Sequence, residues 1–241
     1  MKRVYLDNAA TSYPKPLEVI VAMETYLREI GASPGRGNYK LGLEAGRMLY
    51  ETRCKLKDIF NSPSEENIVF TPNITYALNY VMMGMLRAGD HVITTSMEHN
   101  SVIRPLRYLQ DTKGIDINIV RANTEGIIDP EKIKASLKSN TRLIVFTHAS
   151  NITGGVMPLE SICSLRKHTD AFFAMDAAQT AGIIDIDFKI LNLDFLCFTG
   201  HKSLYGPPGT GGMVLSDRAV SEIDPLIHGG TGSRSHLETQ P

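Results

Sequence analysis

The sequence has little of several features that would assign it directly to a class of protein. Its 241 residues contain no tryptophan and only three cysteines. These cysteines, Cys54, Cys163 and Cys197, form no CxxC pair and are odd in number, which argues against a disulfide framework or a zinc site. No apolar run approaches the length needed to span a membrane, and the N-terminus lacks the apolar stretch of a signal peptide. We therefore predict a cytoplasmic protein that does not act at a membrane.

Neither sign of charge dominates the sequence. Lysine and arginine total 25, aspartate and glutamate total 26, and the net charge is -1. Such a balance provides no basic surface for nucleic acid and no acidic tail, so we expect a small-molecule partner. The chain is also long enough for one large α/β domain with a substantial core.

Apolar segments alternate with helical patterns along the chain. Near-continuous apolar strands are typical of a mainly parallel sheet whose faces are both covered by helices, so the predicted fold class is α/β. The predicted strands are residues 68–71, 91–95, 117–121, 142–148, 171–177, 195–199 and 212–215. The predicted helices are residues 16–30, 41–60, 74–86, 101–110, 130–139 and 159–168. Asp129-Pro130 and Pro158 are typical of helix starts.

Two predicted strands lead to residues that carry chemistry. The strand 195–199 is followed by Lys202 in a Gly/Pro-rich loop, and the strand 171–177 has Asp176 at its carboxyl end. The carboxyl ends of strands are where α/β sheets bind ligands. A lysine that forms a Schiff base and a carboxylate that pairs with a protonated pyridine nitrogen are the two groups that pyridoxal 5'-phosphate requires. The two strand ends therefore indicate this cofactor.

The glycine-rich segments say less about function. Residues 31–38 link two predicted helices and are expected to shape a site or an interface, because glycine and proline favour irregular backbone. Residues 227–236 resemble a phosphate-binding glycine loop, but no helix is predicted after them. A nucleotide-binding α/β domain would need a glycine-rich turn after the first strand, and Val69-Phe-Thr-Pro-Asn73 contains none.

Six short motifs occur along the chain in a fixed order. They are Tyr5-Leu-Asp-Asn-Ala-Ala-Thr11, Phe70-Thr-Pro-Asn-Ile-Thr-Tyr-Ala-Leu-Asn79, Glu98-His-Asn-Ser101, His148-Ala-Ser-Asn151, Asp176-x-x-Gln179 and Thr199-Gly-His-Lys202. Together they resemble the class V aminotransferases, in particular the branch of cysteine desulfurases and selenocysteine lyases, over essentially the whole chain. This resemblance implies the fold type I architecture of pyridoxal phosphate-dependent transferases, with a mainly parallel seven-stranded sheet, and a homodimer. It also implies an N-terminal segment (1–15), a cofactor-binding large domain (16–225) and a link toward a small C-terminal domain (226–241).

The resemblance implies a role for each candidate catalytic residue. Lys202 resembles the Schiff-base lysine, with a pKa that burial and the neighbouring His201 are expected to lower. Asp176 resembles the partner of the pyridine nitrogen. His99 resembles the histidine that stacks on the cofactor ring and moves protons. The alternatives are a surface lysine, an aspartate that caps the next helix and an ordinary loop histidine.

Further residues are implied in binding. Gln179 resembles the side chain that hydrogen-bonds the phenolic oxygen of the ring, and otherwise it starts a helix. The phosphate is expected at Ile74 and Thr75, where a helix begins, although Thr75 alone could also be a helix cap. The expected partners in phosphate binding are Thr199 and His201. The expected substrate ligands are Asn151, which also contacts the cofactor, and Asn8.

The implied activity is conversion of L-cysteine to L-alanine, with sulfur transferred to the thiol of an acceptor protein. A selenocysteine lyase, a class V aminotransferase for another small amino acid and a truncated, non-catalytic cofactor-binding module remain alternatives. In the family, a smaller C-terminal domain supplies a carboxylate-binding arginine and, in desulfurases, a nucleophilic cysteine on a mobile loop. The sequence ends at Pro241 before either, so we expect a truncated chain or one that works with a separate remainder, and assign the persulfide to none of its cysteines.

Overall fold

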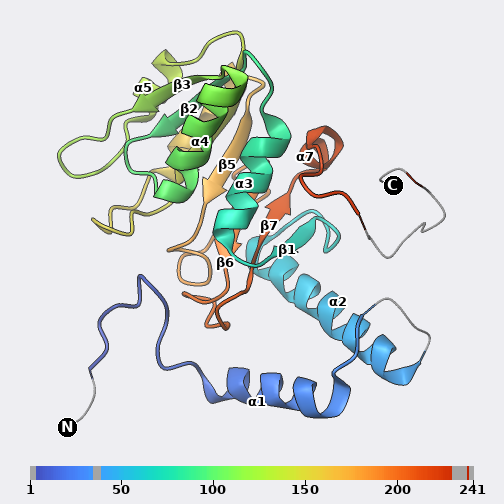
Figure 1. The fold of residues 1–241 in the computed structure, drawn as a ribbon. Helices are drawn as coiled ribbons and strands as arrows, with labels where there is room; N and C mark the ends of the chain where they lie inside the picture. The colour runs from blue at the N-terminus through green and yellow to red at the C-terminus, as the bar shows by residue number, and fades with distance from the viewer. Residues whose placement is uncertain (1–3, 35–38, 230–237, 239–241) are drawn as a thin grey trace.

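A seven-stranded sheet forms the centre of the computed structural model, which describes residues 4–34, 39–229 and 238 (Figure 1). Along the sheet, the described strands follow the order β1-β7-β6-β5-β4-β2-β3. Their bounds are β1 (Ile68–Thr71), β2 (His91–Thr95), β3 (Asp116–Val120), β4 (Thr141–Thr147), β5 (Phe172–Asp176), β6 (Phe195–Thr199) and β7 (Gly211–Leu215). Only β7 runs antiparallel to its neighbours among these strands. The predicted α/β class and mainly parallel seven-stranded sheet are confirmed.

Helices cover both faces of this sheet, which explains why its central strands are continuously apolar. Because side chains alternate along a strand, Phe172 and Ala174 of β5 pack on the face covered by α3 and α4, while Phe173 and Met175 pack on the opposite face. The helices are α1 (Leu17–Thr25), α2 (Lys40–Phe60), α3 (Ile74–Met85), α4 (Asn100–Lys113), α5 (Pro130–Ala135), α6 (Leu159–Cys163) and α7 (Asp217–Glu222). Each of β5, β6 and β7 is buried along its whole length.

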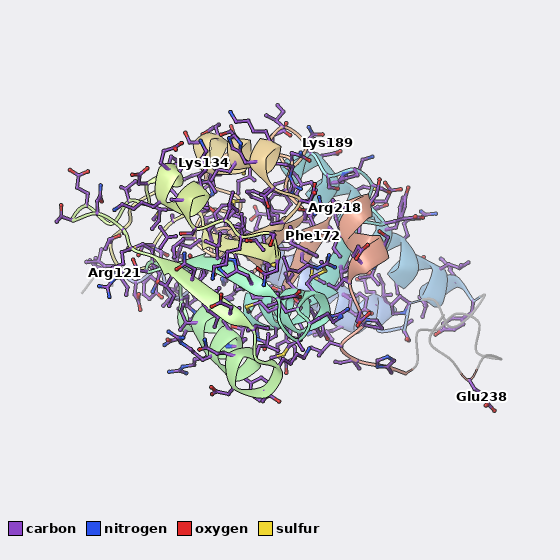
Figure 2. The ribbon with its side chains drawn as sticks, turned by 90° about the horizontal axis from the view of Figure 1, so that it is seen from above. Arg121, Lys134, Phe172, Lys189, Arg218 and Glu238 are labelled. Carbon is purple, nitrogen blue, oxygen red and sulfur yellow. The ribbon has the colours of Figure 1, made fainter. Side chains whose placement is uncertain are left out.

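Some helix predictions need correction in detail. The predicted helix 16–30 is α1 followed by a π-helical turn, Tyr26–Ile30, and the predicted helix 159–168 is α6 followed by a 3-10 helix, Ser164–His168. The predicted helix 130–139 ends early, at Ala135. No helix was predicted at α7, whose six residues are too few to show a helical period. Ser216 caps it, and Arg218 lies over the Phe172 ring at 3.8 Å from the centroid (Figure 2).

The order of the strands creates the place for a site. The chain passes from β2 outward to β3 and returns on the other side of β2 as β4. Where the strand order reverses in this way, the carboxyl ends of the two strands separate and leave a crevice. Pairing between β2 and β4 extends only from His91 and Thr141 to Ile93 and Ile144, so the ends of both strands are unpaired with each other.

The structure does not fully test the predictions on the glycine-rich segments and on the division of the chain into domains. The two glycine-rich segments fall partly outside the described residues, at 35–38 and 230–236. The proposed division into segments 1–15, 16–225 and 226–241 stays a prediction. Within the part of the chain that the structure describes, no helix has the length and apolar character needed to cross a membrane.

Candidate functional site

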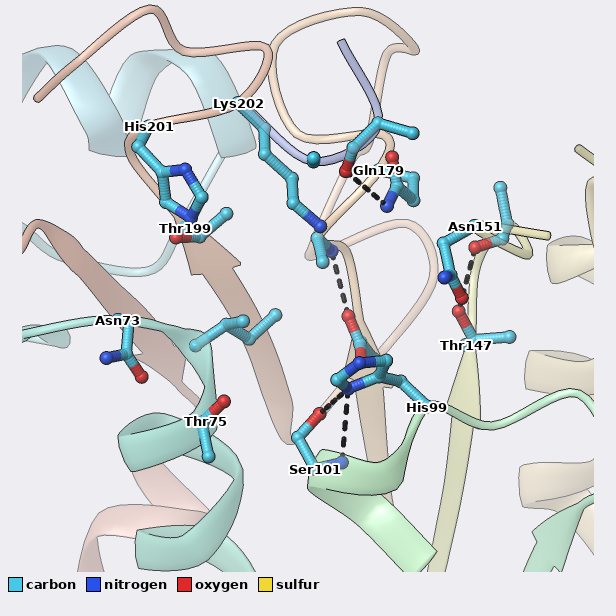
Figure 3. Close-up of a pocket in the computed structure, with 16 residues that line it drawn as sticks. Asn73, Thr75, His99, Ser101, Thr147, Asn151, Gln179, Thr199, His201 and Lys202 are labelled. Carbon is cyan, nitrogen blue, oxygen red and sulfur yellow. Dashed lines mark hydrogen bonds between the residues drawn. The ribbon is translucent and has the colours of Figure 1, made fainter. Parts of the chain in front are cut away.

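A cavity of about 430 Å³ opens at the carboxyl ends of the strands. Thr199, His201 and Lys202 reach it from the end of β6, and Asp176 and Gln179 reach it from the end of β5. In Figure 3 the Lys202 side chain extends into the middle of this cavity, between His201 and Gln179. One cavity therefore collects side chains that the sequence places 26 positions apart, from Asp176 to Lys202.

The opposite wall comes from three other elements. Asn151 follows β4, His99 follows β2, and Ile74 and Thr75 form the first turn of α3. Nine of the ten predicted site residues thus line this cavity. Their roles stay predictions, because the geometry gives their position and not their chemistry.

Asn8 is the predicted site residue outside the wall of this cavity. It is exposed, and its Oδ1 accepts a hydrogen bond from the Tyr13 N–H at 3.3 Å. Its neighbours Ala9 and Ala10 line the cavity instead, and the Ala9 carbonyl accepts a hydrogen bond from Gln179 Nε2 at 3.2 Å (Figure 3). The N-terminal segment therefore borders the site through its backbone.

Lys202 is an amine in a partly buried position. Burial lowers the pKa of Lys202, and the charge of Asp176 opposes this effect. The expectation that His201 lowers this pKa needs correction, because the effect runs the other way: burial, then Lys202, then Lys15 lower the pKa of His201. Lys202 is therefore closer to its neutral form than an exposed lysine, and His201 is driven toward neutrality.

Asp176 is the carboxylate at the floor of the cavity and is only 3% exposed. Burial raises its pKa, while the hydrogen bond from the Ala178 N–H and the nearby Lys202 and His99 act in the opposite direction. The Ala178 bond measures 2.8 Å and reaches Oδ1. No helix follows β5 directly, so Asp176 is not a helix cap and Gln179 does not start a helix.

His99 has a defined orientation because it caps α4. Its Nδ1 accepts a hydrogen bond from the Ser101 N–H at 3.1 Å and lies 2.8 Å from Ser101 Oγ (Figure 3). A ring nitrogen that accepts from a backbone N–H carries no proton, so the neutral imidazole carries its proton on Nε2. This fixes which nitrogen of His99 can donate a proton.

The N-terminus of α3 provides the setting for an anion. The cap of this helix is Asn73, whose Oδ1 accepts from the Tyr76 N–H at 3.2 Å, so Thr75 is not the cap. The N-terminal end of a helix carries partial positive charge, and His201 and Lys202 line the same cavity. An amine, a buried carboxylate and an anion-binding helix end are a donor set that fits pyridoxal phosphate.

One residue beside the site had no predicted role. Glu98 is half-buried as a residue, but its Oε2 is shielded from solvent, and its Oε1 accepts from Thr95 Oγ1 at 2.5 Å and from the Thr147 N–H at 3.0 Å. It therefore joins the ends of β2 and β4, where these strands are not paired. Burial first, and then the charge of Asp176, raise the pKa of Glu98 to about 8. The sequence offers only its position before His99 as a signal.

The cysteines are poor candidates for a nucleophile in this part of the protein. Burial raises the pKa of Cys163 to about 12 and that of Cys197 well above its usual value. Cys54 lies half-buried on α2. None of these three residues lines the cavity.

The sequence model of the family described as "Aminotransferase class-V" matches residues 4–239. This chain belongs to the class V aminotransferase family. It is 40% identical to a "Probable cysteine desulfurase" of Methanothermobacter thermautotrophicus, over 94% of this chain and 56% of that protein. It is 36% identical to "Cysteine desulfurase IscS" of Dictyoglomus turgidum, over 96% of this chain and 58% of that protein. The chain thus spans somewhat more than half the length of these curated relatives.

Solved structures with a similar fold come from the same group of proteins. The structure described as "Apo structure of Cysteine Desulfurase from Thermococcus onnurineus NA1" matches with a TM-score of 0.89 and 32% identity, over 94% of this chain and 57% of that one. A second structure, "SspA in complex with cysteine", matches with a TM-score of 0.87 and 30% identity, over 94% of this chain and 65% of that one. This class V chain therefore has the large-domain fold of the cysteine desulfurases.

Proposed function

We propose that this chain is the cofactor-binding part of a pyridoxal phosphate-dependent transferase that converts L-cysteine to L-alanine and passes the sulfur to an acceptor thiol. The observation that carries the proposal is that Lys202 and Asp176 line one cavity, beside the N-terminus of α3. The identity of 31–40% to proteins named cysteine desulfurases supports this branch of the family.

We assign each part of the cofactor to residues of the cavity. Lys202 would hold its aldehyde carbon and Asp176 its ring nitrogen, while the start of α3, Thr199 and His201 would hold its phosphate. When bound, the cofactor supplies a ring that stores the electrons released when a bond to the substrate α-carbon breaks. Gln179 would donate to the ring's oxygen substituent; in this structure its Nε2 donates to the Ala9 carbonyl.

The proton transfers are assigned to two side chains. Burial lowers the pKa of Lys202, which favours its free amine, and we assign this amine to remove a proton from the substrate α-carbon. His99 presents Nε2 as its proton-bearing atom, because Nδ1 is occupied by the Ser101 N–H. We assign His99 Nε2 to return a proton when alanine forms.

Asp176 and Glu98 provide two carboxyl groups with different tasks. Burial raises the pKa of Asp176, whereas the hydrogen bond from the Ala178 N–H and the nearby Lys202 favour its ionised form. We therefore assign it to hold a cationic ring nitrogen. Glu98 is held in its protonated form by burial, so it adds no second negative charge beside Asp176 at neutral pH.

The substrate, partners and location follow from the same proposal. We assign Asn151, which lines the cavity, and Asn8, whose neighbour Ala9 lines it, to the binding of the substrate. The similar protein SspA is described in complex with cysteine. The complete protein would act as a homodimer and deliver sulfur to an acceptor protein. Three unpaired thiols fit the reducing conditions of the cytoplasm.

Product analysis tests the reaction. The chain is incubated with pyridoxal phosphate, L-cysteine and a reducing thiol, and alanine, sulfide and keto acid are measured. Alanine with sulfide in equal amounts supports a desulfurase, whereas a keto acid formed without sulfide would contradict it and favour an aminotransferase. Selenocysteine is tested in parallel, since a preference for it would indicate a lyase for that amino acid.

A non-catalytic cofactor-binding role is the second candidate, favoured by the absence of an exposed, acidic thiol at the cavity in the described residues. It predicts a visible absorbance band on addition of pyridoxal phosphate that cysteine leaves unchanged. The spectrum of Lys202→Ala, which cannot form the covalent bond, is the control for both candidates.

A further inference from the structure

The peptide carbonyl just before Lys202 is held by an unusual number of donors. The His201 oxygen accepts from Thr11 Oγ1 at 2.9 Å, from the Ser12 N–H at 3.1 Å and from Lys15 Nζ at 2.7 Å. The Ser12 hydroxyl also lies 3.1 Å from it. A carbonyl oxygen has only two lone pairs, so the His201 oxygen is surrounded by more donors than it has lone pairs. We call residues 8–15 the N-terminal clip.

The strongest bond of the clip comes from Lys15. Its ammonium donates to the His201 oxygen and to Ser12 Oγ, both at 2.7 Å. Hydrogen bonds from a charged donor are stronger than those between neutral groups. Among the described residues, Lys15 has no carboxylate within ion-pair distance. Its charge is therefore directed at a backbone oxygen 186 positions away.

The loop that carries Lys202 has bonds of its own, but they leave the His201 carbonyl to the clip. Gly200 N–H donates to the Thr210 carbonyl at 2.8 Å, Gly206 N–H to the Gly200 carbonyl at 2.7 Å, and Tyr205 N–H to the Lys202 carbonyl at 2.9 Å. These bonds close the loop on itself. The clip is what ties its first residues to the rest of the cavity wall.

Lys15 also acts on the site by its charge. It is one of the three causes that lower the pKa of His201, after burial and Lys202. The side chain of His201 takes part in the same arrangement, because its Nδ1 lies 3.0 Å from Thr11 Oγ1. Removing Lys15 should therefore change both the backbone and the protonation of His201.

We propose that Lys15 is a positioning residue: by holding the His201 carbonyl, it fixes the backbone that carries Lys202, so that the amine extends into the cavity before any ligand arrives. The importance of this positioning for catalysis rests on the proposed function. The positioning itself does not, because it is a property of the ligand-free chain.

The test compares three variants. Lys15→Met keeps the length of the side chain and removes its donor, while Lys15→Arg keeps a charged donor. Lys40→Met is the matched control, because the Lys40 side chain is 87% exposed and its one ion pair, to Glu44, is 3.9 Å long. If Lys15→Met did not fold, as judged by circular dichroism, Ser12→Ala would replace it, since it removes the hydroxyl that Lys15 contacts.

The first readout is amide hydrogen exchange of residues 200–206 without cofactor, together with the pKa of His201 from NMR. We expect Lys15→Met to speed exchange in this loop about tenfold, corresponding to about 1.4 kcal/mol, while exchange in β5 stays unchanged. We also expect it to raise the pKa of His201. Lys15→Arg should stay within about twofold of the native chain, and Lys40→Met should match it. Unchanged exchange and unchanged His201 pKa in Lys15→Met would overturn the inference.

The second readout separates this inference from the proposed function. Pyridoxal phosphate is titrated into each variant and the visible band is recorded. About tenfold weaker binding by Lys15→Met, with native binding by Lys40→Met, supports both proposals. A native chain that binds no pyridoxal phosphate but exchanges faster in Lys15→Met would refute the function and keep the positioning role. Equal binding and equal exchange in all variants would refute the positioning role alone.

Discussion

The sheet and the helical arm formed by α1 and the π-helical turn after it differ sharply in how they are stabilised. Strands β5, β6 and β7 are buried throughout, whereas α1 has no buried residue at all. On α1, Leu17 is 69% exposed and Ile20 is 53% exposed. Apolar burial is the dominant favourable term in folding, so the sheet supplies most of the stability of this chain and α1 supplies little.

The site residues are held mainly by the elements of the core. The side chains assigned to the cofactor follow strands or begin a helix that packs on the sheet. The N-terminal clip, which directly precedes α1, is bonded to the backbone of His201 in the cavity wall. The site is therefore preorganised by the core, with one attachment outside it.

The largest expected effect comes from truncating matched apolar residues in the two regions. Phe146 in β4 is fully buried, and we expect Phe146→Ala to lower the free energy of unfolding by about 3–5 kcal/mol. Leu17→Ala on α1 should change it by less than about 0.5 kcal/mol. Urea denaturation of both variants measures this, and similar losses in the two would show that α1 is as well packed as the sheet.

Ion pairs give a second test of the same difference. Asp194, before β6, is buried and pairs with Arg166, and it also accepts from the Phe173 N–H at 2.9 Å and from Ser216 Oγ at 3.0 Å. Asp194→Ala leaves these donors unpaired, and we expect a loss of about 3 kcal/mol.

The control for this prediction lies on the arm. Glu24 and Arg28 form an ion pair at 2.7 Å whose side chains are 57% and 75% exposed. Glu24→Ala should cost less than about 0.5 kcal/mol, because exposed pairs contribute little. Thermal or urea unfolding of the two variants under the same conditions checks the contrast, and a large loss from Glu24→Ala would contradict it.

The last prediction concerns the pH dependence of stability. Burial raises the pKa of Glu98 to about 8 from an ordinary value of 4.5, so the folded chain binds this proton more tightly than the unfolded chain. Its contribution to stability is complete below the ordinary pKa and is lost as the pH rises toward 8. The slope is at most about 1.4 kcal/mol per pH unit. Glu98→Gln keeps the shape of the side chain and should remove this slope, as measured by urea unfolding from pH 4 to 9.

A parallel variant isolates Glu98 from other groups that titrate in this range. Glu125→Gln changes an exposed carboxylate outside the cavity and should leave the native pH dependence intact. If Glu98→Gln also kept the native slope, Glu98 would be ionised in the folded chain and the proposed absence of a second charge beside Asp176 would be wrong.

The parts of the fold that sequence predicted well are those decided by local patterns. Strands such as β6 are continuously apolar because both faces are covered, so their bounds were predicted within one residue. The helix predicted at 101–110 extends to Lys113, since the polar end of α4 carries no apolar period. Pro105 lies inside that helix without ending it.

The parts that sequence missed depend on distant contacts. A glutamate after a strand looks like a surface residue, but the Glu98 carboxyl group is shielded from solvent where β2 and β4 separate. Lys15 looks like a solvated lysine, and its partner is a backbone carbonyl 186 positions further along the chain. On sequence grounds Thr75 could be the cap of α3. The hydrogen bond from the Tyr76 N–H to Asn73 Oδ1 shows that Asn73 is the cap instead. Pattern identifies chemistry-bearing residue types, but it does not report tertiary partners.

The central claim is that the amine of Lys202 is the one that reacts with pyridoxal phosphate. The most direct measurement is reduction with borohydride after incubation with stoichiometric pyridoxal phosphate, followed by peptide mass mapping of the native chain, Lys202→Ala and Lys189→Ala, an exposed lysine as control. We predict one stable label, on Lys202, which Lys189→Ala retains and Lys202→Ala loses. A label spread over surface lysines, or one that persists in Lys202→Ala, would contradict the account.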